Sequence, residues 1–183
     1  MKKMTIPAVL ILLLLLGSLG MYNSIKSAKI EVEARYGQVE NQIQRRADLI
    51  PNLVATVKGY MEYEERVLTE VTAARAQVAS AASPEEMAAA DARLTGALGR
   101  LLAVAENYPG LKADAHFTEL MREISGSENR IAVARKDYNE AIRDYNVTVG
   151  TFPGNLIAGL LGYGELAPFA AEEKAHAVPE VSF

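Results

Sequence analysis

The stretch Val32–Val57, VEARYGQVENQIQRRADLIPNLVATV, carries the pattern that decides the fold. Steps of four and three residues in alternation from Val32 meet apolar side chains, with two exceptions, as far as Val78. This spacing predicts one buried stripe along a long helix, as in coiled coils. The two polar positions are Arg46 and Glu64. The apolar ones are Val32, Tyr36, Val39, Ile43, Ile50, Leu53, Val57, Tyr60, Val67, Val71, Ala74 and Val78.

A second stripe of the same spacing runs from Phe117 to Val149, and its two polar positions are Glu128 and Arg135. The β-branched residues of the chain follow helical rather than alternating spacing, which argues against strands. The two stripes predict an all-α protein, with long heptad-patterned helices in an antiparallel up-and-down helical bundle.

The N-terminal segment Met4–Ile25 holds 22 residues without a charge. At about 1.5 Å per residue, a helix of this length spans roughly the 30 Å hydrocarbon layer of a membrane. Its apolar centre, Ile6–Leu16, is shorter, and the small residues Ser18 and Gly20 behind it also suit a cleaved secretory signal. We favour a retained transmembrane signal anchor over a cleaved signal or a buried soluble helix.

The orientation of this anchor does not follow from charge alone. Lys2 and Lys3 precede the segment, whereas Lys26, Lys29 and Arg35 follow it, so the positive-inside rule gives no decision. The order of basic, apolar and small residues favours an N-terminus in the cytoplasm. We therefore expect the helical bundle on the extracytoplasmic side.

Pro51 interrupts the first stripe. We expect a first helix over residues 24–48, a break at Pro51 and a second helix to about residue 82, since proline removes a backbone donor and crowds the preceding turn. The chain either reverses at Pro51 or only kinks there. A reversal returns the segment after Gly150 to the membrane side, whereas a kink places it at the distal tip.

The later helices have clearer boundaries. Ser83 can cap a third helix, with Pro84 at its first position and Glu86 where a capping box places a carboxylate. The turn at 108–110 precedes a fourth helix over residues 111–149, which a glycine ends. The expected domains are a signal anchor at 1–25, a helical bundle at 26–149 and an apolar C-terminal tail at 150–183.

The C-terminal tail is too apolar to be left in solvent. It either covers the end of the bundle as a short helix and loop, or forms an interface with lipid or a neighbouring subunit. The candidate interface residues are Phe152, Leu156, Ile157, Leu160, Leu161 and Tyr163.

The four charges on the stripes, Arg46, Glu64, Glu128 and Arg135, form a predicted structural polar seam. Burying any of them without a partner would cost several kcal/mol, so they should meet one another or lie at the wet edge of the bundle. Such pairs often fix helix register and partner choice rather than add stability. The alternative is a binding or proton-linked role for these charges.

Composition excludes several classes of function. The net charge of −4 comes from mixed signs without a basic stripe, which excludes a nucleic-acid partner. Cysteine is absent, so disulfides, thiolate metal sites and a cysteine nucleophile are excluded. The histidines, His116 and His176, belong to no Glu-x-x-His pair, and no phosphate loop or nucleophile elbow occurs. We expect no catalytic residue, cofactor or metal.

Several motifs together resemble the LemA family. They are RRADLIPNLV at 45–54, VKGY at 57–60, YPGLKA at 108–113, ENRIAVAR at 128–135, and the pairs Tyr138-Asn139, Tyr145-Asn146 and Phe152-Pro153. The agreement extends from Tyr22 to the end of the chain. Tyr36 and Tyr63 depart from the tryptophan and histidine that are common near these positions.

The resemblance implies a bacterial membrane-associated helical bundle without established catalytic activity, distantly similar to magnetosome membrane proteins. Confinement of anchored subunits to a plane raises their effective concentration, which favours a homo-oligomer. We therefore expect a single-pass inner-membrane scaffold or adaptor, not an enzyme, with membrane lipid and other envelope proteins as partners. The alternative is an oligomeric assembly that coats or remodels lipid through its tail. Asn129, Asn139 and Asn146 are expected to bond across to other helices.

Overall fold

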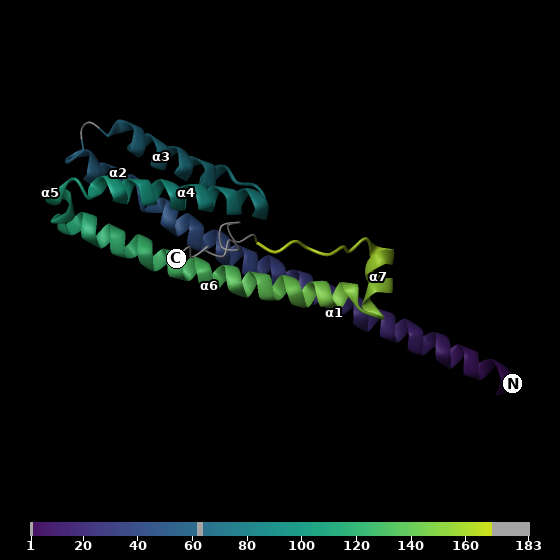
Figure 1. Cartoon of the computed structure of the whole chain (residues 1–183). Helices are drawn as coiled ribbons and strands as arrows, with labels where there is room; N and C mark the ends of the chain where they lie inside the picture. The colour runs from purple at the N-terminus through teal and green to yellow at the C-terminus, as the bar shows by residue number, and fades with distance from the viewer. Residues whose placement is uncertain (1, 62–63, 170–183) are drawn as a thin grey trace, which may run out of the picture. The chain divides into compact units, whose positions relative to one another are not determined.

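The computed structural model describes residues 2–61 and 64–169, without the side chains of residues 2–11 and Leu14. Within these ranges all regular structure is helical (Figure 1), which confirms the predicted all-α class. Tyr63 and His176 lie outside the described residues. The helices are α1 (Lys2–Asp48), α2 (Ile50–Lys58), α3 (Glu65–Ser80), α4 (Pro84–Ala105), α5 (Pro109–Lys112), α6 (Ala115–Gly150) and α7 (Gly154–Leu161).

No helix in the described part of the chain combines the length and the hydropathy needed to cross a membrane. The apolar centre predicted at Ile6–Leu16 falls largely among residues whose side chains are not described.

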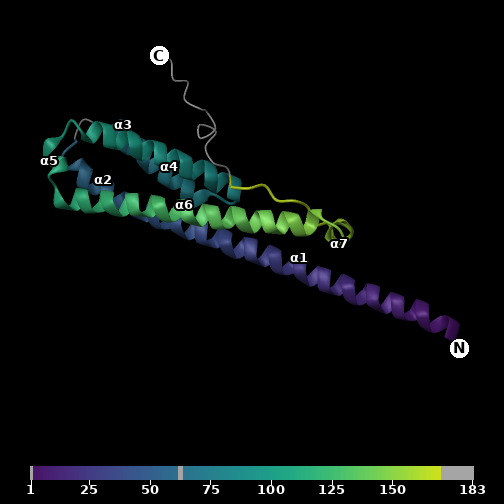
Figure 2. The same ribbon diagram turned by 60° about the horizontal axis from the view of Figure 1, so that its bottom comes forward.

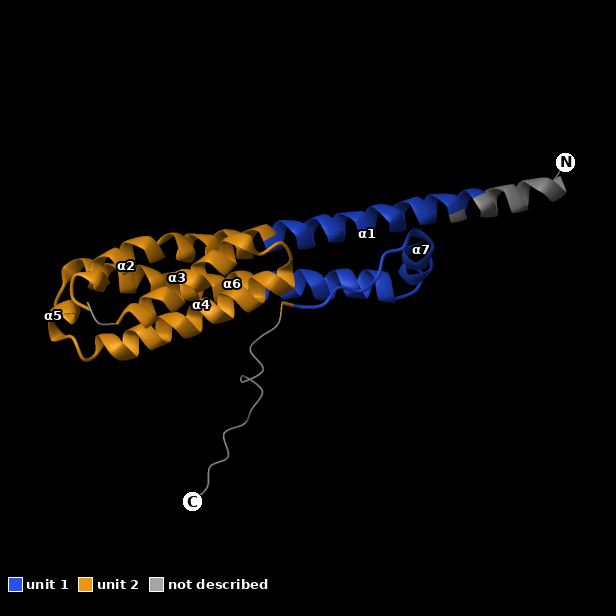
Figure 3. Ribbon diagram, turned by 90° about the horizontal axis from the view of Figure 1, so that it is seen from above, with its two compact units in different colours: residues 1–36, 136–168 blue, residues 37–135, 169–183 orange. Residues whose placement is uncertain are grey.

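The chain forms two compact units that each combine distant segments (Figure 3). Unit 1 consists of residues 1–36 and 136–168, and unit 2 of residues 37–135 and 169–183. The long helices α1 and α6 therefore contribute to both units. The predicted domains, by contrast, are three consecutive segments of the chain: an anchor, a bundle and a tail. This division stays a prediction.

Unit 2 is a helical bundle in which α3 packs on both α2 and α4 (Figures 1 and 2). Its core is built from the apolar faces of these helices and of the adjoining parts of α1 and α6. The buried side chains include Val39, Ile43, Ile50, Leu53, Val57, Met61, Leu68, Val71, Val78, Met87, Leu94, Leu101, Leu111, Ile124 and Ile131.

The chain passes Pro51 without reversing. Leu49, between α1 and α2, keeps a right-handed helical conformation, and its N–H donates to the Arg46 carbonyl at 3.2 Å. The Leu53 N–H donates in turn to the Leu49 carbonyl at 3.1 Å. Pro51 therefore lies in the first turn of a new helix, where its missing donor costs nothing. Of the two alternatives, the interruption without reversal is the one observed.

The chain reverses instead between α2 and α3, which pack on each other, so the prediction of one helix from Pro51 to residue 82 is wrong. At two positions around the break the buried residue is the next one along, since Met61 and Leu68 are buried where the heptad step had named Tyr60 and Val67. The step holds again at Val71, Ala74 and Val78, which are buried as predicted. Glycine, here Gly59, is the weakest helix former after proline, which favours a break at this point. The kinked alternative had placed the segment after Gly150 at the distal tip, whereas Gly154 lies against Met21 of α1.

The predicted start of α4 is confirmed. The Ser83 hydroxyl accepts the Glu86 N–H at 3.2 Å, and the Glu86 carboxylate accepts the Ala82 N–H at 2.8 Å. Helix α6 begins four residues later than predicted, because residues 109–112 form the separate turn α5. Asp114 caps α6 by accepting the Phe117 N–H at 2.9 Å.

In unit 1, the first part of α1 pairs antiparallel with the last part of α6. The rings of Tyr36 and Tyr138 lie 5.5 Å apart, while further back along α1 Met21 lies against Gly154, beyond the end of α6. Helix α7 follows, and Gly162, with a φ of 74°, ends it in the left-handed conformation that glycine adopts without strain. Contacts at both of its ends, between Gly154 and Met21 and between Tyr163 and Lys29, hold α7 beside α1.

Candidate functional site

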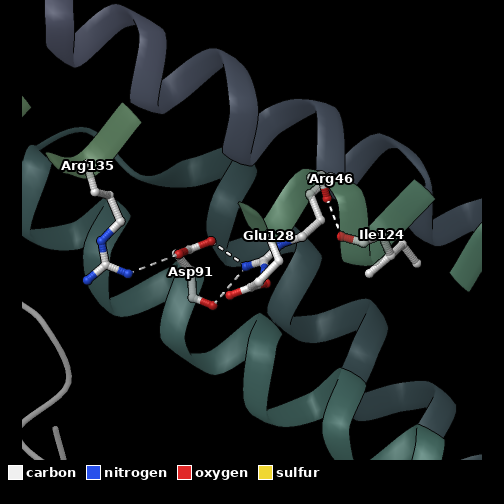
Figure 4. A network of polar contacts seen from close by, with 6 residues as sticks. Arg46, Asp91, Ile124, Glu128 and Arg135 are labelled. Atoms are coloured by element: carbon white, nitrogen blue, oxygen red, sulfur yellow. Dashed lines mark hydrogen bonds and ion pairs between the residues drawn. The ribbon is translucent and has the colours of Figure 1, made fainter. Parts of the chain in front are cut away.

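A buried network of charges joins three helices within unit 2 (Figure 4). Arg46 of α1 is fully buried, and its guanidinium donates from Nη1 to the Glu128 carboxylate of α6. Its Nη2 donates to the Asp91 carboxylate of α4 and, at 3.2 Å, to the Asp91 carbonyl. Arg135 Nη1 lies 4.0 Å from the other carboxylate oxygen of Asp91. One guanidinium therefore ties α1 to both α4 and α6.

The two carboxylates have different environments. The Asp91 side chain is 4% exposed, whereas that of Glu128 is 49% exposed and can be hydrated. Arg135 lies with its guanidinium carbon 5.0 Å from the centre of the buried Phe169 ring, a cation–π arrangement. Asp91 is thus the acidic group of the network whose charge is stabilised mainly by protein partners and not by water.

The structure brings together three of the four charges of the predicted seam. These three, Arg46, Glu128 and Arg135, meet around Asp91. Glu64 does not join them. It lies at the N-terminus of α3, beyond the reversal, where its carboxylate accepts the Tyr108 hydroxyl at 3.5 Å.

Asp91 is the member of the network that the sequence reasoning missed, although a signal was present. Steps of four and three residues from Met87 reach Asp91, Leu94, Leu98 and Leu101, which are all buried on α4. An aspartate within such an apolar stripe is a candidate partner for Arg46, since buried carboxylates are almost always paired.

Burial raises the pKa of Asp91 above its usual value, and repulsion by Glu128 acts in the same direction. The positive charges of Arg46 and Arg135 and the hydrogen bond from Arg46 lower the pKa but do not cancel the effect of burial. In the folded protein Asp91 therefore holds its proton to a higher pH than in the unfolded chain.

This shift predicts how Asp91 links stability to pH. Because its pKa is raised on folding, the contribution of Asp91 is fully present below the unfolded value of about 3.9 and is lost as pH rises through the folded value. The difference in melting temperature between wild type and Asp91→Asn should therefore shrink from pH 4 to pH 7, as measured by circular dichroism. Asp144→Asn, which removes an exposed carboxylate, controls for net charge. A difference that grows with pH would contradict the assignment.

The arrangement is suited to holding helices in register rather than to chemistry. An arginine keeps its charge at any physiological pH, and a guanidinium shared between two carboxylates gives strong, directional bonds. Among the described residues, no group of histidine and acidic side chains is placed to hold a metal ion. His116 is exposed in the first turn of α6.

A groove of about 630 Å³ also lies between α2 and α3 in unit 2. Its lining is mostly aliphatic, with the buried Met61 and Leu68, and the charged residues along it are Lys58 and Glu65. This lining offers no set of converging polar groups that would orient a small ligand.

The candidate interface residues of the tail lie in unit 1. Helix α7 and the turn before it expose most of them, and Ile157 and Tyr163 are half-buried. The exposed ones are Phe152, Leu156, Leu160 and Leu161.

The extended segment after α7, residues 163–169, is fastened to α6. Asn146 donates from Nδ2 to the Leu166 carbonyl and accepts the Leu166 N–H at Oδ1, both at 2.8 Å. The Tyr145 hydroxyl donates to the Gly164 carbonyl at 3.1 Å. Asn146 was expected to bond to another helix, and it binds the backbone of the tail instead, while Asn129 is exposed.

Residues 35–183 match the sequence profile of the LemA family. The chain is also similar to magnetosome protein MamQ 2 of Paramagnetospirillum magneticum, with 25% identity over 88% of this chain and 68% of that protein. Protein LemA of Metamycoplasma hominis shares 25% identity over 84% of this chain and 71% of that protein.

Proposed function

Because the chain belongs to the LemA family, we propose that it is a non-catalytic scaffold, tethered to the inner membrane of the bacterial envelope by its N-terminal segment. The tether crosses the membrane once, and the remainder of the chain lies on the extracytoplasmic side. The protein self-associates in the plane of the membrane and offers its helical surfaces to other envelope proteins.

One observation carries this proposal: helix α1 holds both the apolar stretch and the arginine of the buried network. Exposed leucines occupy α1 between Leu12 and Leu19, and the same helix continues without a break to Arg46 and Asp48. A contiguous exposed apolar surface of this kind is typical of a lipid or protein interface. Helix α1 therefore carries both an apolar surface suited to lipid and, further along, the arginine that binds α4 and α6.

The use of the buried charges supports a scaffold rather than an enzyme. Arg46 and Asp91 are buried and engage each other, so their charges contribute to helix association. A catalytic group needs access to a substrate and a pKa matched to its task. The fully buried Arg46 does not have this access.

The mass of the full-length protein in mild detergent tests self-association. Light scattering, with the detergent contribution subtracted, should give a mass of two or more chains of 19.8 kDa each. The number of chains should stay the same over a range of protein concentrations. A mass of one chain at every concentration would overturn self-association and leave a monomeric adaptor. Chemical cross-linking in native membranes would then identify the proteins that it contacts.

A second candidate function is a membrane-active assembly that coats or remodels lipid through the tail. The exposure of Phe152, Leu156 and Leu160 favours it. Such an assembly should change the curvature of vesicles as protein density rises, as seen by electron microscopy, whereas a tethered scaffold should leave their shape unchanged.

A further inference from the structure

Helix α7 presents an apolar ridge that the rest of unit 1 leaves uncovered. Phe152, Leu156 and Leu160 are 79%, 63% and 82% exposed, and their spacing of four residues places the two leucines on one face of the helix. The opposite face, with Gly154 and Ala158, is buried. Three large exposed apolar side chains on a short helix and the turn before it are typical of an interaction surface.

The chemistry of the segment matches a lipid surface. From Thr151 to Gly164 there is no charged residue, and the next charge is Glu165. Helix α7 has eight residues, which at about 1.5 Å per residue gives roughly 12 Å, far short of the roughly 30 Å hydrocarbon layer. The helix could lie along a membrane boundary but could not cross it.

The position of α7 within unit 1 points to the same surface. A Cβ added to Gly154 would lie 3.4 Å from the Met21 sulfur, so the start of α7 lies directly against α1. Met21 comes two residues after Leu19, the last of the exposed leucines on α1. The apolar ridge of α7 therefore begins where the apolar stretch of α1 ends.

The residues that follow this point on α1 are those found at membrane boundaries. Tyr22 and Lys26 are exposed, and the Lys29 ammonium lies 5.5 Å from the centre of the Tyr163 ring, just beyond α7. Tyrosine and lysine are enriched at the level of lipid headgroups, where an apolar body and a polar tip are both accommodated.

We propose that α7 is an interfacial helix that lies in the headgroup region of the membrane that α1 enters, with Phe152, Leu156 and Leu160 in contact with acyl chains. The inference rests on the proposed tether and adds to it a second lipid contact. Helices of this kind bury their apolar face by about 5–10 Å at the headgroup boundary. With α7 beside Met21, the contact would set the depth of α1 in the membrane.

The absence of cysteine allows a direct test with the full-length protein. Leu156→Cys, labelled with an environment-sensitive fluorophore, is reconstituted into vesicles of phosphatidylethanolamine and phosphatidylglycerol. Lipids carrying a nitroxide near the top or near the end of the acyl chain serve as quenchers. Leu160→Cys repeats the measurement at a second exposed position, and circular dichroism of each labelled protein verifies its fold.

Two further single-cysteine variants act as controls. Leu15→Cys reports on the apolar stretch of α1. Ile30→Cys is the matched negative control, because Ile30 is 53% exposed and apolar but lies between Lys29 and Glu31. It follows Met21 by nine residues, or roughly 14 Å along the helix.

The proposal expects quenching of the Leu156 label, stronger with the shallow nitroxide than with the deep one, and a blue-shifted emission relative to Ile30. Leu15 should be quenched by the lipid nitroxides, and Ile30, next to Lys29, should be quenched less than Leu156 by either one. If Leu156 behaves like Ile30 while Leu15 is quenched, the interfacial helix is overturned and the tether stands. Loss of quenching at Leu15 as well would overturn both the interfacial helix and the tether.

A disulfide experiment tests whether a second copy of the chain is the partner instead. Disulfide cross-linking of unlabelled Leu156→Cys between chains, without lipid quenching of the labelled protein, would overturn the proposal in favour of a second copy.

Discussion

Replacing Arg46 with methionine should lower the free energy of unfolding by about 3–5 kcal/mol, the cost of leaving a buried charge without its partner. The reason lies with Asp91, whose side chain is 4% exposed and would lose the guanidinium that neutralises it. For a chain of this size the loss corresponds to a fall in melting temperature of roughly 6–20 °C. Thermal unfolding of the detergent-solubilised protein, followed by circular dichroism, measures it.

The neighbouring Arg45 provides the matched control. It is exposed on the same turn of α1, so Arg45→Met should change the melting temperature little. Adding Asp91→Leu to Arg46→Met should recover part of the loss, because the unpaired carboxylate is then removed. Equal effects of Arg45→Met and Arg46→Met would show that the network does not hold the helices.

Glu128→Ala tests the outer end of the same network. The Glu128 side chain is about half exposed. In Glu128→Ala, Arg46 would therefore keep its ion pair with Asp91 and would gain contact with water in place of Glu128. The melting temperature should fall by less than in Arg46→Met, and an unchanged melt would rule out a structural role for Glu128.

Gly154→Ala should have the second largest effect, a loss of about 1–3 kcal/mol from overpacking. A Cβ at this position would overlap the Thr148 carbonyl oxygen and lie 3.2 Å from the carbonyl carbon, and a helix backbone cannot move aside cheaply. We expect a lower melting temperature and faster amide hydrogen exchange in residues 151–166, because α7 would detach from α1 and α6.

Gly159→Ala is the control within the same helix. No heavy atom of the described residues lies within 4 Å of its Cβ position, so alanine should be accommodated and gain up to about 1 kcal/mol of helix propensity. Faster exchange in Gly159→Ala than in Gly154→Ala would contradict the packing argument.

The sequence predicted the helices and most of the charge network, because heptad spacing states which side chains share a face. It missed the reversal between α2 and α3 for the same reason. The step of four and three residues met apolar side chains at Tyr60 and Val67, although Met61 and Leu68 are the buried ones. Where two adjacent residues are both apolar, a periodic pattern cannot reveal which of the two is buried.

Two other features depended on contacts that no local pattern specifies. Glu64 satisfied the heptad step as well as Arg46 did, but it lies beyond the reversal and meets Tyr108 instead. The attachment of the tail to α6 joins Asn146 to a backbone twenty residues away. Spacing predicts faces of helices, whereas these partners follow from how the chain folds back on itself.

The bonds of Asn146 have a consequence for how the tail can change in evolution. Both bonds are made to the backbone of residue 166, so the side chain there is free to vary without loss of the attachment. Asn146 has no such freedom. Aspartate would lack the donor for the Leu166 carbonyl, and a longer glutamine would move both groups of the amide outward. The backbone at residue 166 can therefore keep its place on α6 while its side chain changes, as long as the amide of Asn146 is retained.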